Sequence, residues 1–283
     1  MEDKLLRDLI VNALAEDLGD GDHTSLACIP ADSAGKAGLI VRQHGMIAGI
    51  RVAGKVFSII DPDLSFKQFI DDGKPVIPGD IAFHVSGTVR SILKSERIIL
   101  NIMQRMSGIA TSTNEYVTRL RGLKTKILDT RKTSPGLRFL EKEAVRIGGA
   151  MNHRMGLYDM IMLKDNHIDY AGGIENAIRR TSDYLVRKNL DLKIEIEARS
   201  IRDIEIITAT GGIDRIMLDN FSISDTMAAV KLINGRYETE SSGGITLETI
   251  RSYAECGVDF ISVGALTHHV KSLDMSLKAN LAD

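Results

Sequence analysis

The pattern of apolar and polar positions changes along this chain of 283 residues. In the first 18 residues apolar side chains recur every three or four positions, which predicts an amphipathic helix ended by the sequence LGDGD. Between residues 35 and 93 short apolar runs alternate with Gly and Pro, a texture typical of strands joined by turns. Residues 95–121 return to helical spacing, with Gly108 as a candidate break. These elements predict a small α+β domain at residues 1–110.

Beyond residue 125 a different unit repeats. A short β-rich run ends in a polar residue and a helical segment follows, as in KILDT, MIMLKDN, LKIEIEA, RIMLDN and FISVGAL. Such alternation predicts parallel strands joined by helices, and an α/β barrel is the natural closure. A doubly wound open sheet is the alternative, but no GxGxxG motif follows a strand here. We place the barrel at residues 111–267 and expect a C-terminal tail, 268–283, able to pack on the N-terminal domain.

Composition excludes several classes of function. The net charge of −2 and the lack of long Lys/Arg runs argue against nucleic-acid binding. No apolar run approaches the roughly 20 residues of a membrane span. The two cysteines, Cys28 and Cys256, lack the spacing of metal ligands, which predicts buried thiols in a reducing compartment. We therefore expect a cytoplasmic protein that binds neither nucleic acid nor membrane.

Positive charge is concentrated in one region. Between Lys124 and Arg154 there are eight Lys or Arg and three acids, a local charge of +5. Some of these cations follow the four-residue spacing of an exposed, ion-paired helix face. Others lie in turn-like sequence that a helix face does not explain, and they predict a pocket for a small anion: Arg131, Lys132, His153 and Arg154.

Polar residues also end the predicted strands. In a barrel the carboxyl ends of the strands converge on one mouth, and here they carry Lys164, Glu197 and Asp219. Two Gly-bearing strand ends, 241–244 and 262–265, precede helical segments, so their backbone N–H groups can bind a phosphate. No Ser-His-Asp arrangement and no Cys nucleophile with a matching base stands out. This chemistry suits a phosphorylated sugar that reacts with an acid.

Extended motifs point to a family. EDLGDGDHTS, SERIILNIMQRMSGIAT, DTRKTSPGLR, GGAMNHRMGLYDMIMLKDNH, RIMLDN, ESSGGIT and ISVGALTHH occur in this order. On these motifs the whole chain resembles the quinolinate phosphoribosyltransferase family, and DTRKT, NHR and KDNH together are the most specific. The resemblance implies an N-terminal open α/β sandwich domain and a C-terminal incomplete α/β barrel. It also implies a homodimer in which one subunit's N-terminal domain caps the other's barrel.

The activity and the site residues follow from the same resemblance. The family transfers phosphoribosyl from phosphoribosyl pyrophosphate to quinolinate with decarboxylation, giving nicotinate mononucleotide for de novo NAD synthesis. The residues implied for quinolinate are Arg97 from the partner subunit, Thr130, Arg131, Lys132, His153 and Arg154. Those implied for phosphoribosyl pyrophosphate are Lys164, Glu197, Asp219, Ser242, Gly243, Gly244, Ser262, Val263 and Gly264. Catalytic roles are implied for Lys132, Lys164, Glu197 and Asp219, the last two as candidate Mg²⁺ ligands, and no organic cofactor is expected.

Alternatives remain at this point. Strand alternation places Glu195 and Glu197 on one face, and we choose Glu197 because it lies nearer the strand end. A molybdenum-transport-associated relative shares TRKT and HR but usually lacks KDNH. Nicotinate phosphoribosyltransferase needs a pocket for only one carboxylate. In a non-catalytic sensor of phosphorylated metabolites, Glu197 and Asp219 would be dispensable.

Overall fold

The computed structural model describes residues 2–279 and divides into two compact units. The N-terminal unit contains residues up to 114, residues 134–149 and the C-terminal segment from 269. The C-terminal unit contains residues 115–133 and 150–268. Residues 280–283 of the expected tail lie outside the described residues.

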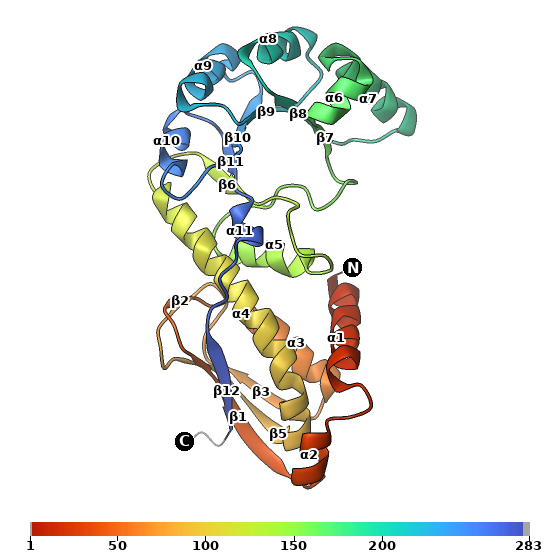
Figure 1. Cartoon of the computed structure of the whole chain (residues 1–283), viewed down its shortest axis with the longest axis vertical. Helices are drawn as coiled ribbons and strands as arrows, with labels where there is room; N and C mark the ends of the chain where they lie inside the picture. The colour runs from red at the N-terminus through yellow and green to blue at the C-terminus, as the bar shows by residue number, and fades with distance from the viewer. Residues whose placement is uncertain (1, 280–283) are drawn as a thin grey trace. The chain divides into compact units, whose positions relative to one another are not determined.

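The N-terminal unit is built on an antiparallel sheet of four strands in the order β12-β1-β5-β3. β12 joins the first strand of the chain, with Leu277 opposite Leu39, so the C-terminal segment completes the N-terminal sheet (Figure 1). A separate two-stranded sheet pairs β2 with β4. The strands are β1 (Ala34–Val41), β2 (Gly45–Met46), β3 (Ser65–Gln68), β4 (Pro75–Val76), β5 (Ile81–Thr88) and β12 (Met275–Ala279).

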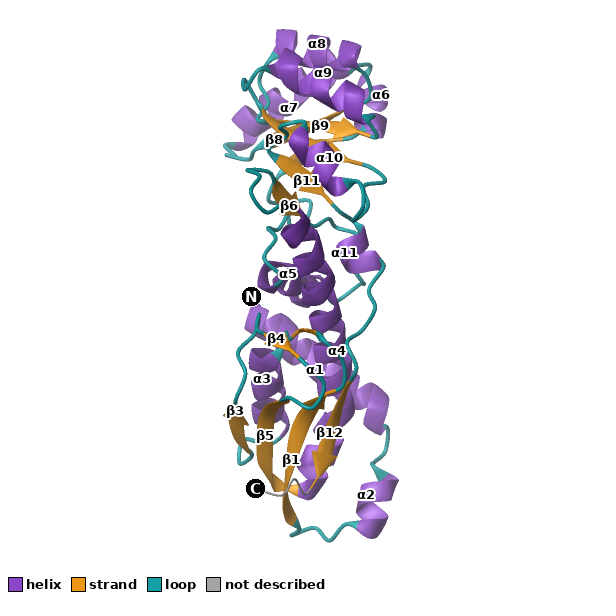
Figure 2. Ribbon diagram, turned by 90° about the vertical axis from the view of Figure 1, so that its left-hand side faces the viewer, coloured by secondary structure: helices purple, strands orange, loops and turns teal. Residues whose placement is uncertain are grey.

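Helices cover one side of this sheet (Figure 2). Phe57 of α3 and Ile99 and Met103 of α4 are buried in one apolar cluster with Leu39 and Phe83 of the sheet. Removing this apolar surface from water is the main favourable contribution to the stability of the unit. The helices are α1 (Glu2–Leu18), α2 (His23–Cys28), α3 (Ile50–Ile60), α4 (Val89–Arg119), of which residues 115–119 belong to the C-terminal unit, and α5 (Arg138–Ile147).

Gly108 allows two segments of the N-terminal unit to approach closely, and the expected helix break there is wrong. A Cβ atom at Gly108 would lie 2.3 Å from the carbonyl oxygen of Lys271, so any side chain would collide with the C-terminal segment. Leu273 N–H donates to Gln104 O at 3.0 Å one helical turn away. Glycine therefore lets the C-terminal segment run along α4 toward the sheet.

The C-terminal unit contains six parallel strands in the order β6-β11-β10-β9-β8-β7. Within residues 2–279 no pairing joins β6 to β7, so the sheet is an incomplete barrel, as the family resemblance implies. The strands are β6 (Lys126–Leu128), β7 (Ile161–Leu163), β8 (Ile194–Ala198), β9 (Arg215–Asp219), β10 (Glu238–Ser242) and β11 (Phe260–Ser262).

Each of these strands except β6 is followed directly in sequence by at least one helix of the same unit. Ser200 and Ser222 accept hydrogen bonds from backbone N–H groups and so cap α8 and α9. The helices from α6 to α10 lie on the outside of the strands (Figure 1). The helices that follow the strands are α6 (Asp165–Ala171), α7 (Ile174–Lys188), α8 (Ile201–Thr210), α9 (Ile223–Ile233), α10 (Ile250–Glu255) and α11 (Ala265–His268).

Two further expectations from the sequence concern membrane-spanning helices and the burial of the two cysteines. Over residues 2–279, no helix combines the length and the apolarity needed to cross a membrane. The cytoplasmic location stays a prediction. Cys256 is buried, but Cys28 is exposed, so the expectation of two buried thiols is wrong for Cys28.

Candidate active site

Three predicted residues meet at the carboxyl ends of neighbouring strands in the C-terminal unit. Lys164, directly after β7, places its Nζ 2.8 Å from Glu197 Oε1 near the end of β8. Asp165 N–H donates to the other oxygen of Glu197 at 3.1 Å. Asp219 ends β9, and burial followed by the nearby Glu197 carboxylate raises its pKa. The structure therefore brings a lysine and two carboxylates together.

Glu195 and Glu197 share a face of β8 but occupy different environments. Glu197 is at the mouth, where it contacts Lys164. Glu195 is fully buried, with Glu195 Oε2 2.9 Å from His153 Nε2. Of the two alternatives that strand alternation left open, Glu197 is the one beside Lys164.

The loop after β6 carries Thr130, Arg131 and Lys132. Lys132 N–H donates to Thr130 Oγ1 at 3.1 Å, and Thr267 Oγ1 donates to Lys132 O at 2.9 Å, so both ends of the short turn are held. Arg131 Nε is buried without a hydrogen-bond partner among the described residues. A buried, unpaired donor of this kind is costly unless a ligand completes it.

Arg154 lies close to Arg131. Burial, followed by the charge of Arg131, lowers the pKa of Arg154. Arg154 Nη1 donates to Met160 O at 3.1 Å, which fixes the direction of the guanidinium. Two partly buried guanidiniums repel each other, and an anion between them would relieve this repulsion. The pair is therefore suited to a ligand with more than one negative charge.

His153 makes contacts that differ from those expected for a ligand-binding residue. Its N–H donates to Asp129 Oδ1 at 2.8 Å, and its Nδ1 accepts the N–H of Arg154 at 2.7 Å. Because Nδ1 accepts, the ring proton is on Nε2, which faces Glu195 at 2.9 Å and Glu240 at 3.5 Å. Both ring nitrogens are thus engaged inside the protein rather than presented to a substrate.

A buried charge network below the mouth was missed by the sequence analysis. Arg215 Nη1 lies 3.0 Å from Glu240 Oε2, and Arg215 Nη2 lies 3.1 Å from Glu238 Oε2. Burial and the neighbouring Glu240 carboxylate raise the pKa of Glu195 to about 7. The available signal was the alternation of charged residues within buried strands, as in IEIEA and ETESS.

The first Gly-bearing turn, after β10, requires glycine. Gly243 has φ +96°, and a Cβ atom there would lie 2.1 Å from Asn220 Oδ1. Asn220, itself at φ 56°, donates its N–H to Ser242 O at 2.9 Å. No described atom lies within 4 Å of a Cβ built on Gly244, so this part of the turn is open.

The second turn, after β11, is only partly suited to bind an anion. Val263 is buried and its N–H donates to Leu128 O at 2.9 Å, so its amide is already used within the sheet. Ser262 is also buried. A Cβ atom on Gly264 would lie 3.2 Å from Lys132 Cδ, which shows that the Lys132 side chain passes over this turn. The turn therefore brings Gly264 and Lys132 together.

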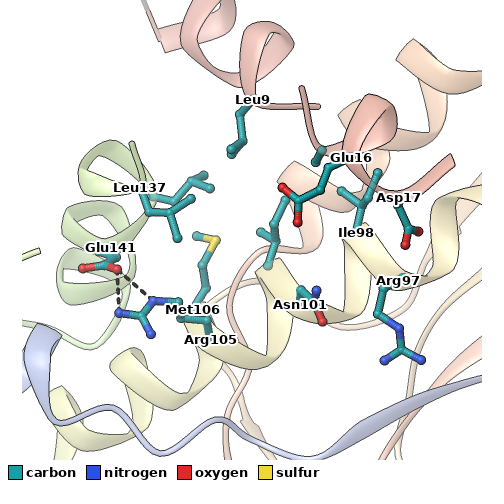
Figure 3. Close-up of a pocket in the computed structure, with 13 residues that line it drawn as sticks. Leu9, Glu16, Asp17, Arg97, Ile98, Asn101, Arg105, Met106, Leu137 and Glu141 are labelled. Atoms are coloured by element: carbon teal, nitrogen blue, oxygen red, sulfur yellow. Dashed lines mark hydrogen bonds and ion pairs between the residues drawn. The ribbon is translucent and has the colours of Figure 1, made fainter. Parts of the chain in front are cut away.

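Arg97 belongs to the N-terminal unit, whereas the other predicted site residues belong to the C-terminal unit. It extends from α4 and lines a pocket of about 290 Å³ together with Glu16 and Asp17 (Figure 3). In the same pocket Arg105 is paired with the buried Glu141 at 2.7 Å.

Comparisons with known proteins agree along the whole chain. Residues 22–107 match the family model "Quinolinate phosphoribosyl transferase, N-terminal domain", and residues 109–278 match its C-terminal counterpart. The chain is 46% identical over 288 residues to the chloroplastic nicotinate-nucleotide pyrophosphorylase (carboxylating) of Arabidopsis thaliana, covering 96% of this chain and 82% of that protein. Identity to the probable nicotinate-nucleotide pyrophosphorylase (carboxylating) of Bacillus subtilis is 41%, covering 98% and 94%.

A solved structure agrees with these sequence matches. The crystal structure of NadC from Streptococcus pyogenes superposes with a TM-score of 0.92 at 39% identity, covering 98% of this chain and 96% of that one.

Proposed function

This chain belongs to the quinolinate phosphoribosyltransferase family and has that family's activity in de novo NAD synthesis, and we propose that the mouth of its C-terminal unit performs the reaction. Phosphoribosyl pyrophosphate and quinolinate give nicotinate mononucleotide, pyrophosphate and carbon dioxide. The observation that carries the proposal is the neighbouring pair of guanidiniums, Arg131 and Arg154, in the unit that also holds the Lys164–Glu197 ion pair.

The two guanidiniums bind the two carboxylates of quinolinate. Arg is suited to this task because its planar fork donates two parallel hydrogen bonds to one carboxylate. The unpaired Nε of Arg131 supports a role in binding. Thr130 and Lys132 complete the basic side of the pocket. A site for nicotinate would have to neutralise one carboxylate only, so this arrangement favours the dicarboxylate.

Glu197 and Asp219 act on the ribose. When the pyridine nitrogen attacks the anomeric carbon and pyrophosphate departs, positive charge develops on the sugar. Two carboxylates fixed beside that carbon stabilise this charge, and the ion pair with Lys164 fixes the position of Glu197. When the 2-carboxylate departs as carbon dioxide, the electron pair of the broken bond stays on the ring carbon, where the adjacent cationic nitrogen stabilises it, and this carbon then takes a proton from water. No side chain is obliged to act as acid or base.

The same carboxylates fit a hard divalent cation. The raised pKa of Asp219 reflects burial and then repulsion from Glu197, and a cation between the two oxygen ligands would relieve that repulsion. Glu197 and Asp219 would hold Mg²⁺, whose charge offsets that of the pyrophosphate leaving group.

The phosphate groups occupy the two Gly-bearing turns. Gly243 allows the tight turn against Asn220, the open backbone at Gly244 can approach an anion closely, and the Lys132 side chain supplies a point charge beside Gly264. Ser242 and Ser262 flank these backbone groups. The amide of Val263 already bonds to Leu128, so Val263 shapes the turn and does not donate to the phosphate.

Arg97 reaches the quinolinate pocket of a partner subunit in a homodimer. The support is that Arg97 is a cation in the N-terminal unit, lining an open pocket, whereas the remaining cations are in the C-terminal unit. A shared site would add a third guanidinium to the dicarboxylate pocket without another residue from the barrel strands.

The first experiment is an assay of the purified full-length protein with phosphoribosyl pyrophosphate, Mg²⁺ and either quinolinate or nicotinate. Quinolinate-dependent release of nicotinate mononucleotide and carbon dioxide is the expected result. Turnover of nicotinate alone would transfer the proposal to the non-decarboxylating reaction. Binding of phosphoribosyl pyrophosphate by folded protein without turnover of either acid would favour a sensor or the molybdenum-associated relative.

A further inference from the structure

His153 is anchored by side chains from three strands or strand ends of the C-terminal unit. Asp129, after β6, accepts its backbone N–H at 2.8 Å. Glu195 of β8 and Glu240 of β10 face its Nε2 at 2.9 and 3.5 Å. All four residues are buried. The ring of His153 is therefore fixed between strands that are not neighbours in sequence.

The fixed ring of His153 also restricts the next residue, Arg154. Arg154 N–H donates to His153 Nδ1 at 2.7 Å, so the orientation of the ring and the backbone of Arg154 are coupled. At its other end the Arg154 guanidinium donates to Met160 O. A side chain held at both ends has few ways to present its free donors. A shift of about 1 Å in such a group can cost on the order of a hundredfold in activity.

We propose that Glu195 and Glu240 are positioning residues for quinolinate recognition, which orient the His153 ring through the contacts of their carboxylates with Nε2 and through it hold Arg154 against the substrate. This inference rests on the proposed role of Arg154. Neither carboxylate touches substrate in this arrangement. Arg215 Nη1 lies 3.0 Å from Glu240 Oε2, and this ion pair holds the Glu240 carboxylate in place.

The same cluster has the composition of a metal site, but a guanidinium already lies against one of its carboxylates. His153, Glu195 and Glu240 offer ligand atoms within 4.8 Å of one another. The guanidinium of Arg215 already pairs with the Glu240 carboxylate. A divalent cation bound by Glu240 would have to compete with this positive charge. The contacts of His153 with Arg154 and Glu195 therefore favour a positioning role over metal binding.

Three replacements of Glu195 test this inference by steady-state kinetics with each substrate varied in turn. Glu195→Leu keeps the volume and removes the acceptor, and we expect the KM for quinolinate to rise about tenfold, with the KM for phosphoribosyl pyrophosphate changed by less than about twofold. Glu195→Gln keeps an oxygen that accepts from Nε2, so it should stay within about threefold of the parent. If the leucine variant does not fold, Glu195→Asp, which withdraws the acceptor, replaces it with the same expectation.

Glu238→Leu is the matched control, because Glu238 shares Arg215 with Glu240 but is not among the carboxylates that face His153. It should leave both KM values unchanged. Unchanged kinetics for the Leu and Asp variants, a parallel rise in both KM values, or a Gln variant as impaired as the Leu variant would each overturn the positioning role.

Arg154→Lys, measured beside these variants, separates the two proposals. It should raise the KM for quinolinate strongly. If it does not, the proposed function of Arg154 fails, whereas a strong effect of Arg154→Lys with no effect of the Glu195 variants refutes the positioning inference alone.

Discussion

The sheets of the two units differ in the side chains that they bury. In the N-terminal unit Phe57, Phe66 and Phe83 pack with ring centroids 4.9 to 5.8 Å apart, and the cluster around them is apolar. In the C-terminal unit the strand face opposite the helices buries Glu195 and Glu240. Burying charge is costly unless it is paired, so the second interior trades stability for the precise placement of groups. The apolar interior of the first unit serves mainly to stabilise the fold, whereas the buried carboxylates of the second unit serve mainly to place the groups of the site.

The largest effect expected from this contrast is on folding. Phe83→Ala should lower the free energy of unfolding by about 3–5 kcal/mol, because Phe83 is fully buried among other aromatic rings. Urea denaturation of the parent and the variant measures this loss. Phe69→Ala, at a 47% exposed position of the same unit, is the control and should change stability little. A loss of less than about 1 kcal/mol at Phe83 would mean that the apolar core does not dominate stability.

The next effect is on catalysis and should leave folding intact. Glu197→Gln removes the charge that we propose stabilises the developing sugar cation while keeping the shape, and turnover should fall about 10²–10³-fold. The thermal midpoint should change by only a few degrees, because Glu197 pairs at the mouth with a Lys164 side chain that is 46% exposed. Glu205→Gln on the outside of α8 is the control. Turnover within about threefold of the parent would remove Glu197 from the mechanism.

A mixing experiment tests whether the N-terminal unit also contributes chemistry. Arg97→Ala and Arg131→Ala homodimers should each lose most of their activity. In a shared site, random exchange of subunits restores one intact site in half of the dimers, so activity should return to about a quarter of the parent value. Mass spectrometry of differently tagged subunits verifies the exchange. Demonstrated exchange without recovery would contradict a site shared between subunits.

Local signals in the sequence were sufficient for the fold and for the mouth of the barrel. The alternation of short β-rich runs with helical segments predicted the parallel strands, and the polar residues that end these runs put Lys164, Glu197 and Asp219 at strand ends, where the structure has them. These predictions succeed because strand ends and turns are defined by neighbours in the chain.

Residues whose role depends on distant partners could not be predicted in this way. His153 was expected to face the substrate, yet its Nε2 faces Glu195 and Glu240, which are 42 and 87 positions further along the chain. Val263 was expected to offer its amide to phosphate, yet strand pairing gives that amide to Leu128. Both differences depend on which strands become neighbours, and no local pattern contains that information.

The smallest effect concerns the buried carboxyl that the sequence left undecided. His153, Glu240 and Arg215 surround Glu195, and burial together with Glu240 raises its pKa from 4.5 to about 7. A carboxyl that binds its proton more tightly in the folded state stabilises the fold below its unfolded pKa, and this contribution is lost as the pH rises through about 7. The unfolding free energy of the parent should therefore fall relative to Glu195→Gln between pH 5 and pH 8. Urea denaturation across that range measures the difference, and a difference that does not change with pH would mean that Glu195 keeps an ordinary pKa and that Arg215 and His153 fully offset its burial.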